Sequence, residues 1–338
     1  MKAWTLIAHG QPERAFELRD HRDPRPGPGQ VLIQCEGFGL NYADAMAVRG
    51  LYREAPPLPS IIGYEVVGRV IGMGADTPTD LLGRRVVAMT RFGGYAEMAV
   101  TDHRACAEIP DQLPIGEAAA LATQGSTAWY AARVLCPLHP GERVLVHSAA
   151  GGVGSLIVQL AAADGCEVIG VVSSGAKRDL VLGLGAAHVI DRSAGDYAAQ
   201  ANRILGKQRL DASFNAVAGA TFSKDMRLLG SGGRLVLYGG AQRGALGALG
   251  TLRFVWSMGA VLPIFLMMKS KSILGVNMLK LGDHHPDLMA RCFREMVSAH
   301  ARGAVKPHVH AERPYAQLPD ALGALSRGAT MGKVAIHW

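Results

Sequence analysis

The sequence predicts an α/β protein in which a doubly wound parallel sheet is combined with a second, β-rich domain. From about Gly116 onward, short apolar strands alternate with helical segments, and a glycine-rich turn joins one of these strands to a helix. The first third of the chain is instead rich in Gly and Pro. Of the 338 residues, 49% are hydrophobic and only 19% are charged, so the chain can bury a sizeable core.

The β-rich domain is expected to be a distorted barrel. Strand-like runs occur at 31–35, 66–71 and 85–89, and they are broken by the proline-rich stretches 25–29 and 56–59. The tail from about Lys306 is strand-like again. We therefore expect the tail to return to the first domain.

The parallel sheet is predicted from six apolar strands, at 143–147, 167–172, 188–190, 212–215, 234–238 and 273–277. The helical segments associated with them are expected near 155–164, 177–184, 197–205, 224–229 and 288–300. Parallel neighbours require right-handed crossovers, which cover both faces of the sheet with helices. This pattern indicates a doubly wound sheet.

The segment after the first of these strands has the features of a dinucleotide site. Residues 144–147 run directly into a small-residue turn and then into an apolar helix. The small residues of a G-x-G-x-x-G-like pattern allow a tight turn and let a pyrophosphate approach backbone N–H groups at a helix N-terminus. The residues predicted to bind the cofactor here are Ala149, Gly151, Gly152, Val153 and Gly154.

The end of the second strand indicates which nicotinamide cofactor is bound. An NAD site usually places an acid there, on the ribose 2′-hydroxyl. This chain has Ser173, Ser174 and Lys177 in that region, with Arg192 following the third strand. Hydroxyl donors and a cation favour a 2′-phosphate, so the sequence predicts NADPH. The alternative is that Lys177 merely begins a solvated helix face.

Charge, cysteine content and hydropathy exclude several classes of protein. The chain has 35 Lys and Arg against 28 Asp and Glu, a net charge of +7, but the basic residues are scattered, so no nucleic acid is expected. The five cysteines lie far apart without a C-x-x-C pair, so disulfides and a Cys-rich zinc lobe are not expected. The apolar uncharged run 254–268 is shorter than the roughly 18 to 20 residues that span a bilayer. With no signal-peptide pattern at the start, we expect a cytoplasmic protein without a transmembrane segment.

Several motifs together resemble the medium-chain dehydrogenase/reductases, in their zinc-independent quinone oxidoreductase branch. They are LNYAD at 40–44, GLY at 50–52, GYEVVG at 63–68, GGYAE at 93–97, the turn at 148–154, SKD at 223–225 and GKV at 332–334. The stretch from 238 to 308 is similar to the vesicle amine transport protein 1 homologues of that branch. The resemblance implies a GroES-like catalytic domain at 1–120, a Rossmann nucleotide-binding domain at 121–278, and a return to the catalytic domain at 279–338.

The same resemblance argues against zinc. The zinc alcohol dehydrogenases of the wider family need a Cys near residue 41 and a His followed by Glu in the 63–68 motif. This chain has Asn41 at about the first position and Tyr64 before Glu65 at the second. Neither residue supplies a thiolate or an imidazole, so no metal site is expected.

Without zinc, hydrogen-bond donors must polarise the substrate carbonyl. The resemblance places Tyr52 and Asn41 at that site, Tyr52 as a hydrogen-bond or proton donor and Asn41 as a group that orients substrate or the nicotinamide ribose. Tyr52 as a pocket wall and Asn41 as a turn residue remain alternatives. The further cofactor contacts implied by the resemblance are Thr127, Tyr130, Gly239, Asn277 and Lys333. For Asn277 a strand cap, and for Lys333 a surface position, remain open.

The predicted function is NADPH-dependent reduction of quinones or α,β-unsaturated carbonyl compounds. Two alternatives remain: an enoyl-thioester reductase, and a regulatory or membrane-associated nucleotide-binding protein with little turnover. The apolar segment 254–268 favours the last only if it is exposed; Gly259 and Pro263 break it, so we expect it to cover the substrate cleft or a dimer interface. The apolar strand 272–277 would be a sheet edge, and the resemblance implies a homodimer that pairs these edges.

Overall fold

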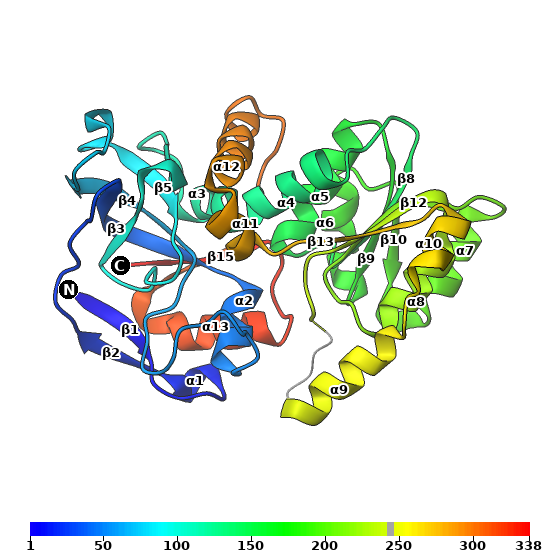
Figure 1. Ribbon diagram of the computed structural model, residues 1–338, viewed down its shortest axis with the longest axis horizontal. Helices are drawn as coiled ribbons and strands as arrows, with labels where there is room; N and C mark the ends of the chain where they lie inside the picture. Colours follow the sequence, from blue (N-terminus) through cyan, green and yellow to red (C-terminus); the bar gives the residue numbers. More distant parts are fainter. Residues whose placement is uncertain (242–246) are drawn as a thin grey trace. The chain divides into compact units, whose positions relative to one another are not determined.

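The computed structural model describes residues 1–241 and 247–338, with the side chains of 247–249 left aside. It divides into two compact units (Figure 1). Unit 1 consists of Met1–Ser126 together with Met278–Trp338, and unit 2 is Thr127–Asn277. Unit 1 is therefore built from the two ends of the chain.

Unit 1 is centred on a seven-stranded sheet with the order β14-β15-β3-β4-β5-β7, in which β6 also pairs with β3. Its strands are β3 (Gln30–Leu40), β4 (Glu65–Met73), β5 (Arg85–Met89), β6 (Met98–Asp102), β7 (Cys106–Glu108), β14 (Val309–Pro314) and β15 (Lys333–His337). Strand β15 pairs antiparallel with β3, so the C-terminal strand lies among N-terminal ones, red beside blue in Figure 1. The runs expected at 31–35, 66–71 and 85–89 lie in β3, β4 and β5.

A second sheet, several helices and turns complete unit 1. A two-stranded sheet is formed by β1 (Lys2–Leu6) and β2 (Phe16–Asp20). The α-helices are α1 (Pro12–Ala15), α2 (Tyr42–Val48), α3 (Ile115–Ala120), α11 (Met278–His284), α12 (Pro286–Ala301) and α13 (Leu318–Ser326). The 3-10 turns are η1 (Thr79–Leu81), η2 (His103–Ala105) and η7 (Tyr315–Gln317), and η3 (Leu121–Gly125) is π-helical.

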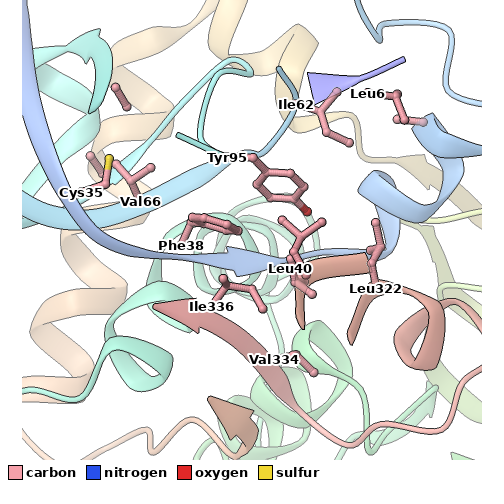
Figure 2. Close-up of a cluster of buried hydrophobic side chains, with 14 of the residues drawn as sticks. Leu6, Cys35, Phe38, Leu40, Ile62, Val66, Tyr95, Leu322, Val334 and Ile336 are labelled. Carbon is pink, nitrogen blue, oxygen red and sulfur yellow. The ribbon is translucent and has the colours of Figure 1, made fainter. Parts of the chain in front are cut away.

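The core of unit 1 joins side chains from both ends of the chain (Figure 2). The Tyr95 ring is fully buried and stacks at 4.7 Å between centroids on Phe38 of β3. Val334 and Ile336 of β15 and Leu322 of α13 belong to the same cluster. The apolar interior of this unit therefore requires the returning C-terminal segment.

Unit 2 contains a six-stranded parallel sheet with the order β10-β9-β8-β11-β12-β13, which confirms the predicted doubly wound fold. Its strands are β8 (Arg143–His147), β9 (Glu167–Val172), β10 (His188–Asp191), β11 (Leu210–Asn215), β12 (Leu229–Leu237) and β13 (Ser272–Gly275). Its principal helices are α4 (Ser126–Trp129), the π-helical η4 (Tyr130–Leu135), α5 (Gly152–Ala163), α6 (Arg178–Gly183), α7 (Tyr197–Leu205), α8 (Ala220–Leu228), α9 (Gly247–Met258) and α10 (Pro263–Lys269).

Four of the expected strands have different limits in the structure: β10 and β11 extend beyond the expected ranges, and β12 and β13 both begin and end earlier than expected. Strand β12 begins at Leu229 rather than 234, because Leu210 pairs with Leu229 before the register shifts to Ala212 opposite Arg234. The glycines between Leu229 and Arg234 are typical of a turn. In the structure they instead form an irregularity within strand β12. Strand β13 ends at Gly275 rather than at 277.

An exposed apolar segment precedes β13 in the chain, and among the described strands β13 has only β12 as a neighbour, so it forms an edge of the sheet. The stretch Gly250–Lys269 has a mean hydropathy of 1.6 and is long and apolar enough to cross a membrane. This stretch is longer than the uncharged run 254–268 because it also includes Arg253, the three residues before it, and Lys269. It forms two helices, α9 and α10, and Trp256 is 84% exposed. The segment 254–268 is therefore exposed in a single chain.

Candidate active site

The turn between β8 and α5 has the geometry of a phosphate-binding loop. Ser148 adopts a positive φ of 52°, and the Gly151 N–H donates to the Ser148 carbonyl at 2.7 Å. A Cβ at Gly154 would lie 2.3 Å from that same carbonyl oxygen, so only glycine allows α5 to start this close to the turn. The first N–H groups of a helix have no intrahelical partner, and together with the helix dipole they attract phosphate. The predicted residues 149–154 thus form a cradle that fits a pyrophosphate.

A buried polar network includes His147, the last residue of β8 before this turn. The carboxylate of Asp225 on α8 is fully buried, and His147 at the end of β8 meets it at 3.0 Å. Tyr197, Ser213 and Asn215 each donate to it, at 2.7, 2.9 and 2.6 Å. Burial opposes its charge, but His147 and the donors outweigh burial and lower the pKa of Asp225. We infer that this network fixes the strand end from which the turn begins.

Four predicted phosphate-binding residues lie at the carboxyl ends of neighbouring strands. Ser173 and Ser174 follow β9, Lys177 ends the turn η5 (Gly175–Lys177), and Arg192 follows β10. Strands β9 and β10 are paired with Val172 opposite Asp191, which brings these ends together.

The two cations of this group lie near one another. Burial, and then the positive charge of Arg192, lowers the pKa of Lys177. Arg178 donates to the Val189 carbonyl at 3.0 Å, and the Asp191 carboxylate accepts from the Ser193 N–H at 2.8 Å. The Asp191 carboxylate is also within the electrostatic reach of Arg192, and a contact of Lys177 and Arg192 with a 2′-phosphate remains a prediction.

The other residues implied by the resemblance are dispersed over unit 2. Thr127 is buried in α4, and the half-buried Tyr130 begins η4. Gly239 follows β12, and a Cβ there would lie 2.7 Å from the Ala216 carbonyl oxygen. Asn277 is exposed two residues after β13. Their contact with a cofactor remains a prediction.

In unit 1, Asn41 and Lys333 belong to a buried ionic cluster with Glu65. Lys333 donates to the Glu65 carboxylate at 2.5 Å, and neither side chain is exposed. The Asn41 amide donates to both oxygens of Glu65, at 2.7 and 2.9 Å, and its carbonyl accepts from Lys333 at 3.3 Å. Lys333 is therefore not a surface residue. A direct contact of its ammonium with a cofactor would require these bonds to break.

Tyr52 is the predicted catalytic residue that the structure leaves accessible. It lies in the loop after α2 and is half-buried. Its ring meets Tyr64 edge-on, with centroids 6.1 Å apart, and Tyr64 in turn contacts Phe92 at 5.3 Å. Burial, and then the charge of Glu54, raises the pKa of Tyr52 to about 12. Its hydroxyl is therefore a protonated donor at neutral pH.

Asp44 is a site residue that the sequence reasoning missed. It is fully buried on α2, and its Oδ2 accepts the Asn41 backbone N–H at 2.8 Å. Burial, and then the negative charge of Glu65, raises the pKa of Asp44 to about 8, although Lys333 acts in the opposite direction. The only signal in the sequence was an acid at the third residue of a helix, which is equally typical of a helix cap.

Comparison with known proteins identifies the family. An alcohol dehydrogenase GroES-like domain matches residues 27–111, and a zinc-binding dehydrogenase domain matches residues 152–295. Among the described residues, no group of three or more His, Cys, Asp or Glu is arranged to hold a metal ion.

Relatives and solved structures agree with these matches. The human synaptic vesicle membrane protein VAT-1 homolog is 30% identical over 95% of this chain and 82% of its own length. The Escherichia coli quinone oxidoreductase, crystallised with NADPH, superimposes with a TM-score of 0.87 at 25% identity over the full length of both chains. The Thermus thermophilus quinone oxidoreductase, also studied as an NADPH complex, gives 0.81 at 30% identity with the same coverage.

The fold and these relatives define an oxidoreductase. The chain belongs to the medium-chain dehydrogenase/reductase family, in its zinc-independent quinone oxidoreductase branch.

We predict that the buried ion pair stabilises unit 1. Lys333→Met leaves the Glu65 carboxylate buried without its cation, which should lower the free energy of unfolding by about 3–5 kcal/mol. Lys280, exposed and 3.9 Å from Asp283, is the matched control, and Lys280→Met should change stability by less than about 1 kcal/mol. Denaturant unfolding of both variants measures the difference. Equal stabilities would show that the pair contributes nothing.

Proposed function

We propose that this protein is an NADPH-dependent, zinc-independent reductase of quinones or α,β-unsaturated carbonyl compounds. The observation that carries the proposal is the placement of Lys177 and Arg192 at the carboxyl ends of β9 and β10, in the same sheet as β8 and the glycine turn that follows it. It is supported by the quinone oxidoreductases of similar structure that were crystallised with NADPH.

Each group of residues has a defined task in this proposal. The N-terminal amides of α5 hold the pyrophosphate, and Ser173, Ser174, Lys177 and Arg192 hold the 2′-phosphate. When bound, NADPH supplies a hydride to the substrate. Tyr52 donates its hydroxyl proton to the substrate oxygen on which negative charge develops. Asn41 acts indirectly, because its amide holds the Glu65 carboxylate beneath the start of α2.

The acceptor is proposed as a quinone or an enone, with an enoyl thioester as the alternative. Quinones and enones both accept a hydride and accumulate charge on oxygen, so one phenol donor serves both. A panel of quinones, enones and enoyl thioesters, assayed by NADPH oxidation, decides among them. Absence of turnover with every acceptor would contradict the proposed activity.

We predict that Lys177→Ala selectively weakens NADPH binding. A charge-assisted hydrogen bond contributes roughly 1.5–3 kcal/mol, so the Kd for NADPH should rise about 10- to 150-fold. The Kd for NADH should not change. Arg178→Ala is the control, because that guanidinium is bound to the Val189 carbonyl. Equal affinities of the unmodified protein for NADPH and NADH would overturn the cofactor assignment.

A second prediction concerns Tyr52. Tyr52→Phe should lower kcat for enones on the order of 10²-fold, since one donor to the developing oxyanion is lost. Quinone reduction should fall less, because the charge of a hydroquinone anion is delocalised. The measurement is kcat for both substrate classes, with the Kd for NADPH as a check on binding. Unchanged enone turnover would make Tyr52 a wall of the pocket.

The third prediction is that the protein is a cytoplasmic homodimer that pairs its β13 edges. The exposed apolar side chains of α9 and α10 lie in the chain next to this unpaired edge, and a second copy would cover both. Trp256→Glu should therefore convert a dimer of about twice 35.7 kDa into single chains. Light scattering at micromolar concentration measures the mass.

The control for this experiment is Leu182→Glu, a 37% exposed residue of α6. It should leave the dimer intact. An unmodified protein of single-chain mass would contradict the dimer. If that single chain also bound lipid vesicles, the regulatory, membrane-associated alternative would be favoured, because the apolar helices would then remain exposed.

A further inference from the structure

Six buried polar atoms in unit 1 lack a hydrogen-bond partner among the described residues. Three of them are Oδ1 of Asp44 and the hydroxyl oxygens of Tyr64 and Tyr95, and the others belong to Ser60, Gln124 and Trp338. Asp44 and Tyr95 are not exposed at all, and Tyr64 is 4% exposed. Leaving a buried polar group unpaired is unfavourable, so such a group calls for an ordered water or a function.

These three atoms belong to neighbouring groups. Asp44 comes from α2, Tyr64 directly precedes β4, and Tyr95 lies in the loop between β5 and β6. The charge of Asp44 raises the pKa of Tyr64 and of Tyr95, in each case after the larger effect of burial. A carboxyl and two phenols without partners can together coordinate a water molecule, which needs two to four polar partners.

Tyr64 also connects this buried group to the accessible phenol. Its ring meets Tyr52 edge-on at 6.1 Å, and the charge of Tyr52 raises the pKa of Tyr64, after the larger effects of burial and of Asp44. Tyr64 is thus in contact with Tyr52 and within the electrostatic reach of Asp44. Tyr95 is also within the electrostatic reach of Asp44, but its ring contacts are with Phe16 and Phe38.

We propose that Asp44 stores the proton consumed in the reaction. A bridging water relays this proton to Tyr64, and Tyr64 passes it to Tyr52. The proposal rests on the reductase activity proposed above. In each turnover the Tyr52 O–H bond breaks and an O–H bond forms on the reduced substrate. Tyr64 then reprotonates the Tyr52 phenolate, and the water relays the Asp44 proton to Tyr64. Asp44 is left as a carboxylate and takes up one proton from solvent, so the sequence consumes one proton per hydride.

The surroundings of Asp44 suit this role. Burial and then the charge of Glu65 on β4 favour its neutral form, whereas the Asn41 N–H and Lys333 of β15 favour its charged form. The balance raises the pKa of Asp44 to about 8, so the carboxyl carries its proton at neutral pH and loses it as the pH rises through 8. With Oδ2 accepting from Asn41, a proton on Oδ1 has the unpaired phenols or their water as acceptors.

The first test requires no turnover. Infrared difference spectra of the full-length protein, titrated from pH 6 to 10, should show the C=O band of a protonated carboxyl that disappears near pH 8. The band should be missing in Asp44→Asn. A band that persists in that variant, or no band at all, would overturn the stored proton.

The second test separates the relay from simple structural support. Tyr64→Phe removes only a hydroxyl and should lower kcat for an enone about 10²-fold, the usual loss when a general acid pathway is removed. Tyr95→Phe removes another buried hydroxyl within the electrostatic reach of Asp44 and should keep kcat within about threefold, since the ring contacts of Tyr95 are with Phe16 and Phe38 rather than with Tyr52. The KM for NADPH should be unchanged in both variants.

The pH profile gives an independent signature. The enone kcat of the unmodified protein should fall as the pH rises through about 8, because the stored proton is lost. In Asp44→Asn the limb should disappear and kcat should be low throughout.

The failures of the two proposals are distinguishable. If Tyr52→Phe lowers enone turnover but Tyr64→Phe does not, the relay is wrong and the reductase stands. If the unmodified protein reduces no quinone or enone, the proposed function fails, and the relay fails with it. If Asp44→Asn does not fold, the spectra of the unmodified protein and the Tyr64→Phe and Tyr95→Phe pair still decide the relay.

Discussion

The buried ion pair between Glu65 and Lys333 is the interaction on which the architecture of unit 1 depends. A carboxylate removed from water is tolerated only with a counter-charge and further hydrogen bonds, and here Lys333 and the Asn41 amide supply them. The same pair sets the electrostatic environment of Asp44, which feels Glu65 and Lys333 with opposite signs. The contact between Glu65 and Lys333 therefore affects both the packing at the start of α2 and the proton affinity of the Asp44 carboxyl.

Two buried carboxyls in this protein behave in opposite ways for a simple reason. Asp225 receives hydrogen bonds from three side chains and faces His147, so it remains charged in the core of unit 2. Asp44 receives one backbone N–H and faces a second carboxylate, so it favours the neutral form. Burial is common to both. The number of donors decides whether the group fixes a turn or holds a proton.

The sequence was sufficient for the features that are local. Strands β8 and β9 have the predicted limits because buried parallel strands are continuous apolar runs. The phosphate loop was also predictable, since its turn, glycines and helix are consecutive. The start of β12 was not, because its glycines have the composition of a turn. The Asn41–Lys333 contact spans 292 positions, and no periodicity within one sequence indicates such a pairing.

The discontinuity of unit 1 has a consequence for synthesis of the chain. Unit 2 is a continuous segment, so all of its strands are available to one another before the last sixty or so residues are made. Glu65, by contrast, is synthesised long before Lys333, so its carboxylate has no counter-charge until β15 has been made. A nascent or truncated chain that ends before β15 carries an unpaired carboxylate and an exposed edge of β3, and is a natural substrate for chaperones and proteases.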